Sequence, residues 1–288
     1  MKLKFMVVCM LALLTTTSPA GDLGQDPRII DTAGNAVSID QLGNALSDAD
    51  IVVLAEKHHS ADVQRAEAEV IRTVIRARKS KGLDVGFTTA WEFLNYTDKR
   101  GIEAHFSAFR EDRITKPELL RALGNDQADT YIPILEATRD LGGELMGVNL
   151  PRKYKAPVVK SGISAADRNI IPPGFQMCDE RYFERFESAL EEQSHSHTKS
   201  GSVRNLFAAQ CLTDDVIAYR LLEDTATLKF LVVGSIHADF GQGTVQKLRA
   251  RAPDKKTQVV RFFAESEETN DFDQRPGIAE YVFYLNES

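Results

Sequence analysis

The feature that most constrains the fold is an alternation of short apolar runs with longer stretches of helical periodicity. The runs typical of strands are 51–54, 85–93, 144–151, 228–237, 257–263 and 279–285. Helical patterns cover 61–82 (with Ser60 as a candidate N-cap), 98–108, 116–123, 128–140, 179–193, 202–223 and 243–251. Strands separated by helices of this length indicate βαβ units. We therefore predict an α/β fold whose mostly parallel sheet is flanked by helices on both faces, with an N-terminal β-hairpin at 28–39.

The composition is that of an ordinary globular protein. Hydrophobic residues make up 43% and charged residues 27% of the 288 residues, which is enough apolar material for a substantial core. No internal repeat or low-complexity linker divides the chain, so we predict one domain over residues 21–288. The formal net charge is −7 and no basic patch is visible, which argues against nucleic acid as a partner.

The first twenty residues have the organisation of a secretory signal peptide. Lys2 and Lys4 precede an apolar stretch at 5–14, and Ser18 and Ala20 stand at the −3 and −1 positions of a cleavage site. That stretch is too short to span a bilayer, and no other segment approaches a membrane span. We expect export to the periplasm or outside the cell, as a freely soluble protein rather than a lipoprotein. Losing two lysines would move the net charge from −7 to −9.

Two cysteines, Cys178 and Cys211, would remain in the mature chain. An oxidising compartment permits a disulfide between them. Their separation in sequence says nothing about the distance between the two sulfur atoms. The sequence therefore leaves open whether the two cysteines form a disulfide or remain free thiols.

Polar side chains follow four of the predicted strands at the points where the strands end. In a parallel sheet, ligands bind beyond the carboxyl ends of the strands, so these side chains belong to one candidate site. They are Glu56, His58 and His59 after the first strand, Glu92 in the second, Asn149 and Arg152 after the third, and His237 and Asp239 after the fourth.

Several chemistries fit this set of side chains. His58, His237, Glu56 and Glu92 could bind zinc, manganese or cobalt, and the metal would activate a water molecule. The same groups could perform acid–base catalysis without a metal. They could also surround a haem held by His or Tyr, with Arg152 on a propionate. Helix capping, ion pairing or core packing would explain each residue singly.

Other polar residues are candidates for supporting roles. Gln210 and Asp214 lie four apart on a helix with an apolar stripe, and with Asn149 they could hold the cluster through hydrogen bonds. Tyr131 and Tyr182 could ligate ferric iron, although core packing is the commoner role. His195 and His197 could reach one ligand, but their serine-rich loop is more typical of a solvated segment.

Several blocks, taken in order, resemble the ChaN-like haem-binding uptake family. They are "VVLAEKHHSADVQ", "WEF", "YIPILEATRDLGGELMGVNLPR", "FAAQCLTDDVIA" and "VVGSIHADFGQGTVQKL", within residues 50–250. The family is similar in fold to the Tiki metalloproteases and the erythromycin esterases. Its first block, Gly-Glu-x-His, here has Ala55 in place of the glycine.

The resemblance implies an exported protein of haem or iron uptake. On that basis we expect haem, or another small iron-containing molecule, to bind at the strand ends. The cofactor-binding residues would come from His58, His237, Arg152, Tyr131 and Tyr182. A homodimer and a partner in the uptake machinery are also implied. The Tiki relatives imply the alternative, a metal-dependent hydrolase with Glu56 and Glu92 as catalytic carboxylates.

Overall fold

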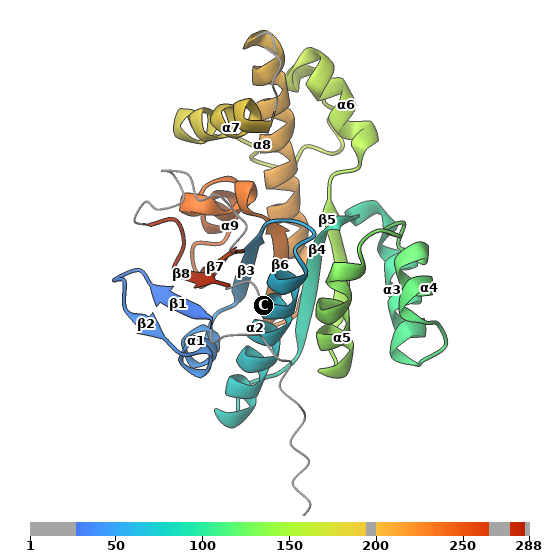
Figure 1. The fold of residues 1–288 in the computed structure, drawn as a ribbon. Helices are drawn as coiled ribbons and strands as arrows, with labels where there is room; N and C mark the ends of the chain where they lie inside the picture. Colours follow the sequence, from blue (N-terminus) through green and yellow to red (C-terminus); the bar gives the residue numbers. More distant parts are fainter. Residues whose placement is uncertain (1–26, 194–199, 265–276, 286–288) are drawn as a thin grey trace, which may run out of the picture.

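One eight-stranded β-sheet runs through the protein, with helices on both of its faces (Figure 1). The computed structural model describes residues 27–193, 200–264 and 277–285. The strand order is β2-β1-β8-β7-β3-β6-β4-β5. The strands are β1 (Arg28–Asp31), β2 (Ala36–Val37), β3 (Ile51–Glu56), β4 (Phe87–Asn95), β5 (Glu144–Asn149), β6 (Leu228–Gly234), β7 (Thr257–Phe263) and β8 (Tyr281–Tyr284).

The strands from β3 to β8 pair in parallel, whereas β1 pairs antiparallel with both β2 and β8. The predicted mostly parallel sheet with an N-terminal hairpin is therefore confirmed. The nine longer helices that connect the described strands are α1 (Ile39–Leu46), α2 (Ala61–Ser80), α3 (Lys99–Arg110), α4 (Lys116–Ala122), α5 (Ile132–Asp140), α6 (Arg152–Ser161), α7 (Glu180–Gln193), α8 (Ser200–Glu223) and α9 (Gly243–Arg251). In the described residues, none of these helices is long and apolar enough to cross a membrane.

Strand β3 shows how the sheet is buried on both faces. Val52 and Leu54 pack into the core beneath α1, α2 and α5, whereas Val53 and Ala55 pack into the core beneath α8 and α9. Successive side chains of a strand point to opposite faces, and every residue of β3 is buried. Such a strand is apolar throughout, because both faces are covered. By the same alternation, the last residue, Glu56, turns toward α2.

Two helices that the sequence analysis did not predict are α1 and α6. Ser38 and Gln41 form a reciprocal capping box at the start of α1, a signal that was present in the sequence. Helix α6 has Pro157 inside it and buries only Val158, so its helical periodicity is weak. Ser60 is the N-cap residue of α2 as predicted, but its side chain makes no capping hydrogen bond.

Candidate functional site

A chain of alternating carboxylates and imidazoles crosses the carboxyl ends of β3, β4 and β6. Nδ1 of His58 is 2.8 Å from Oε1 of Glu56, and Nε2 of His58 is 3.8 Å from Oε2 of Glu92. Nε2 of His237 lies 3.1 Å from Oε1 of Glu92, and its Nδ1 lies 2.6 Å from Oδ1 of Asp214. The structure therefore brings together five residues that the sequence singled out. We call them the carboxylate–imidazole chain.

The end of this chain at Glu56 is buried beneath α2. The carboxylate of Glu56 is 1% exposed and accepts hydrogen bonds from Gln64 and from the Tyr131 hydroxyl. Glu67, one turn further along α2, is also buried. Burial, and then the charge of Glu56, raise the pKa of Glu67 well above its usual value. Burial and the neighbouring carboxyl group of Glu56 therefore favour the protonated form of Glu67.

The other end of the chain is buried beneath α8 and α9. Oδ1 of Asp214 accepts hydrogen bonds from Nδ1 of His237 at 2.6 Å and from the Thr244 hydroxyl at 2.8 Å. The Tyr182 hydroxyl donates to Oδ2 of the same carboxylate at 3.0 Å. The side-chain amide of Gln210 lies 3.2 Å from the Tyr182 hydroxyl and 3.1 Å from Nδ1 of His237. Asp214 thus holds Nδ1 of His237, and the side chain of Gln210 lies against the same imidazole.

The charges of Glu92 and His237 stabilise each other. Burial alone would raise the pKa of Glu92, but the charge of His237 and its hydrogen bond lower that pKa to about 2. Burial alone would lower the pKa of His237, but Glu92 and Asp214 raise that pKa to about 10. At neutral pH this part of the chain is an imidazolium between two carboxylates.

His58 is the solvent-facing member of the chain, since its side chain is 36% exposed. Burial lowers its pKa, but the hydrogen bond to Glu56 and the charge of Glu92 outweigh that effect and raise it. A Cβ atom on Gly234 would lie 2.8 Å from Nε2 of His58. Glycine at this position therefore makes room for the imidazole. The backbone N–H of Gly234 also donates to Glu92 at 2.8 Å.

A lysine that the sequence analysis did not single out approaches the same end of the sheet. Lys155, on α6, donates from Nζ to Oδ1 of Asn149 at 2.8 Å. Its ammonium group is close enough to Glu92 and Asp214 for their charges to act on its pKa. Arg152, at the start of α6, is exposed. Among the described contacts, none joins Arg152 to the carboxylate–imidazole chain.

Asp239 and His59 make no hydrogen bond or ion pair with the carboxylate–imidazole chain among the described contacts, although the ring centroid of His59 is 6.4 Å from that of His58. Asp239 is 3.3 Å from the guanidinium of Arg261. His59 is exposed and adopts a left-handed backbone conformation, with φ of 60°. Its ring centroid is 5.3 Å from that of Phe93. His195 and His197 lie outside the described residues.

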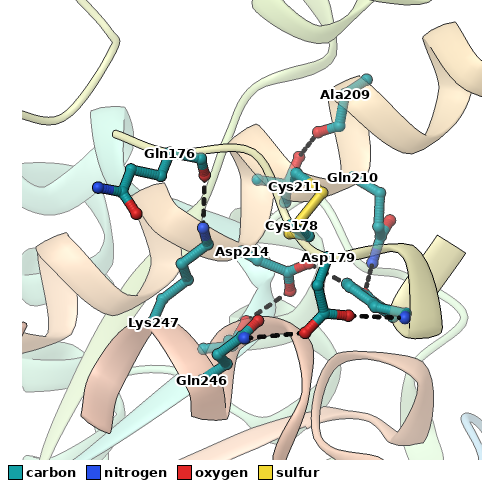
Figure 2. Close-up of a disulfide and its surroundings, with 12 residues drawn as sticks. Gln176, Cys178, Asp179, Ala209, Gln210, Cys211, Asp214, Gln246 and Lys247 are labelled. Carbon is teal, nitrogen blue, oxygen red and sulfur yellow. Dashed lines mark hydrogen bonds between the residues drawn. A yellow bond between two sulfur atoms is a disulfide. The ribbon is translucent and has the colours of Figure 1, made fainter. Parts of the chain in front are cut away.

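A disulfide joins Cys178 to Cys211 beside the buried end of the chain (Figure 2). It connects the segment before α7 to α8, and the neighbouring residues extend this connection. Oδ1 of Asp179 accepts the backbone N–H of Tyr182 at 2.9 Å, and Oδ2 accepts a hydrogen bond from Gln246 of α9 at 3.2 Å. The disulfide thus ties the start of α7, which carries Tyr182, to the helix that carries Asp214.

The predicted metal site finds no support in the geometry. In the part of the chain that the structure describes, no group of three or more His, Cys, Asp or Glu side chains is arranged to hold a metal ion. The physical reason is that the members pair with one another. Both nitrogens of His237 face carboxylates, and the carboxylate of Glu56 already accepts hydrogen bonds from Gln64 and Tyr131.

Fold and site together define a class of protein: a mostly parallel α/β protein with a charged site at the carboxyl ends of its strands. Residues 42–248 match the family described as "Haem-binding uptake, Tiki superfamily, ChaN". The chain belongs to this family, as the sequence blocks indicated. No curated protein matches it in sequence.

Solved structures share the fold. A structure described as cofacial heme binding to ChaN of Campylobacter jejuni superposes with a TM-score of 0.71 at 19% identity, covering 90% of this chain and 97% of that one. A mutant of the erythromycin esterase EreC in its open conformation gives a TM-score of 0.41 at 12% identity, covering 83% and 77%. At 19% identity, the first likeness establishes the fold of this chain.

Proposed function

We propose that the protein binds haem at the carboxyl ends of the sheet strands and serves haem or iron uptake after export. This proposal rests on the hydrogen bonding and partial exposure of His58. Glu56 holds its Nδ1, which leaves Nε2 as the nitrogen that would bind the iron of an incoming haem. A carboxylate that holds the far nitrogen fixes both the tautomer and the orientation of a ligating histidine.

The chemistry of the donor set fits haem. Bound haem supplies an iron centre that accepts an imidazole nitrogen. Phe93 offers an aromatic ring 4.8 Å from that of His58, and the exposed ring of His59 lies next to it. His237, Tyr131 and Tyr182 support the site from within, because each already pairs with a buried carboxylate.

One observation favours a second function, hydrolysis by acid–base catalysis without a metal. A partly exposed imidazole whose Nδ1 contacts a carboxylate, and whose Nε2 makes no hydrogen bond to the described residues, is also the arrangement of a general base. In that reading, Glu56 orients His58, and Glu92 would assist it from 3.8 Å. The absorption spectrum with hemin separates the two functions, because only the first requires a porphyrin.

The experiment is a hemin titration of the purified mature protein, followed by the Soret band, with bound metals assayed on the same sample. We expect a saturable shift that is weakened about tenfold or more by His58→Ala. His105→Ala, on α3 and outside the carboxylate–imidazole chain, is the matched control. A wild-type protein that leaves the Soret band at the position of free hemin would refute haem binding.

Assembly is part of the same proposal. We expect a homodimer, and a partner in the uptake machinery that receives or delivers the haem. Light scattering with and without one equivalent of hemin measures the mass directly. A monomer under both conditions would remove the dimer from the proposal and leave haem binding to be judged by the titration.

A further inference from the structure

Lys155 is a partly buried cation whose hydrogen-bonding capacity the protein fills only in part. An ammonium group carries three N–H donors and no acceptor. Within the described residues, its hydrogen-bond acceptor is Oδ1 of Asn149, at 2.8 Å. Two N–H bonds are therefore open to another acceptor. Burial lowers the pKa of Lys155 below its usual value, by more than the charges of Glu92 and Asp214 raise it.

The neighbouring carboxylates do not fill these donors. Asp214 is occupied by His237, Thr244 and Tyr182. Glu92 is occupied by the backbone N–H of Gly234 and by His237. No direct ion pair joins Lys155 to a carboxylate among the described residues. A partly desolvated charge without a direct counter-ion is unfavourable, so an anionic group that arrives from outside would be bound favourably here.

The fold places Lys155 at the end of the sheet that carries the candidate site. Asn149 is the last residue of β5, and α6 begins at Arg152, so Lys155 lies in the first turn of a helix that starts at the carboxyl edge of the sheet. Helix α6 runs beside α8, which carries Asp214 (Figure 1). The hydrogen bond to Asn149 holds the ammonium where the charges of Glu92 and Asp214 act on it. Arg152 is on the same helix but is exposed.

We propose that Lys155, positioned by Asn149, binds a carboxylate of the ligand, which under the proposed function is a propionate of haem. This inference rests on the proposed function and adds the residue that recognises the anionic part of the ligand. It also explains why two cations of one helix differ. Arg152 is exposed, whereas Lys155 is held by Asn149 at the end of the sheet that carries the carboxylate–imidazole chain.

The test compares hemin with hemin dimethyl ester, in which both propionates are uncharged, in the wild-type protein and in Lys155→Gln. A charge-assisted hydrogen bond predicts that Lys155→Gln weakens hemin about tenfold, whereas the ester binds both proteins equally. Lys160→Gln, an exposed lysine on the same helix, is the matched control and leaves both affinities unchanged. Lys155→Arg keeps the charge and is expected to recover part of the hemin affinity.

A measurement on the wild-type protein alone keeps the inference testable if Lys155→Gln does not fold: the ester must bind several-fold more weakly than hemin. Equal affinity of the wild type for hemin and for the ester would overturn the inference. Equal losses of affinity for both porphyrins in Lys155→Gln would overturn it too. Either result would leave haem binding itself intact. Failure of the wild type to bind either porphyrin would instead overturn the proposed function together with this one.

Discussion

His237 is held between two carboxylates, with Nδ1 2.6 Å from Asp214 and Nε2 3.1 Å from Glu92. The imidazole is 4% exposed, so water contributes little to this pairing. Each carboxylate receives a backbone or hydroxyl donor in addition, the Gly234 N–H for Glu92 and the Thr244 hydroxyl for Asp214. His237 is therefore a structural cation of the site, and His58 is the more exposed imidazole of the pair.

This pairing predicts how stability depends on pH. The pKa of His237 rises from 6.5 to about 10 on folding, so its stabilisation is complete below pH 6.5 and is lost as pH rises through about 10. The pKa of Glu92 falls from 4.5 to about 2, so its stabilisation is complete above pH 4.5 and is lost as pH falls through about 2. The two contributions together are greatest between pH 4.5 and 6.5.

His237→Gln tests this dependence. We expect the wild type to lose up to about 1.4 kcal/mol of unfolding free energy per pH unit above pH 6.5 through this group, and the variant to lose that slope. Urea unfolding at pH 6, 7, 8 and 9 gives both slopes. The substitution of the exposed His59 by Gln is the control, and its slope should equal that of the wild type. An unchanged slope in His237→Gln would contradict a paired imidazolium.

Glu67→Gln should reduce the loss of unfolding free energy at high pH. Burial raises the pKa of Glu67 well above 4.5, so its acid form is favoured on folding. Its contribution is complete below pH 4.5 and is lost as pH rises through the folded-state pKa. Glutamine keeps the shape without an ionisable proton, so the variant should equal or exceed the wild type in unfolding free energy at pH 8. Glu103→Gln, on an exposed face of α3, is the control. A loss of several kcal/mol in Glu67→Gln at pH 8 would mean that an ionised Glu67 is needed.

The disulfide between Cys178 and Cys211 should contribute substantially to stability. Its two residues are 33 apart in sequence, and closing a loop of that size restricts the unfolded chain by about 3–4 kcal/mol. We expect the double variant Cys178→Ser/Cys211→Ser to lose about that amount in urea unfolding. Dithiothreitol should have a similar effect on the wild type and none on the variant. Equal unfolding midpoints for wild type and variant would show that the crosslink does not stabilise the fold.

Ala55→Gly should weaken the fold without affecting the ligand. The methyl group of Ala55 is fully buried in the core between the sheet and the α8–α9 layer, away from Glu56. Removing it costs about 0.8 kcal/mol of burial and adds flexibility to the unfolded strand. We expect a total loss of about 1–2 kcal/mol in unfolding free energy and a hemin affinity within about twofold of the wild type. A large change in hemin affinity would place this methyl group at the site after all.

Much of the fold was predictable because its signals are local. The apolar runs of β3 and β6, buried on both faces, indicated a parallel sheet, and the helix from Ala61 follows a simple 3.6-residue period. Helix α6 was not predicted, since Pro157 and its charged residues weaken that period. The position of Lys155 beside Asn149 was missed with it, because nothing in the local sequence distinguishes Lys155 from Arg152 or Lys160.

The sequence by itself determined which residues end the strands, and therefore that Glu56, His58, Glu92 and His237 meet at one edge of the sheet. Only the tertiary structure decided how they pair. Glu56 faces the α2 side of the sheet, as Val52 and Leu54 of β3 do, whereas Glu92 faces the α8 side, as Ala90 of β4 does, because every second residue of a strand faces the same layer. The segments packed on each face then supply hydrogen-bond partners: Gln64 and Tyr131 bond Glu56 on one side, and Asp214 bonds His237 on the other. Hydrogen bonds act over about 3 Å, so a contact between distant segments depends on packing that no local pattern encodes.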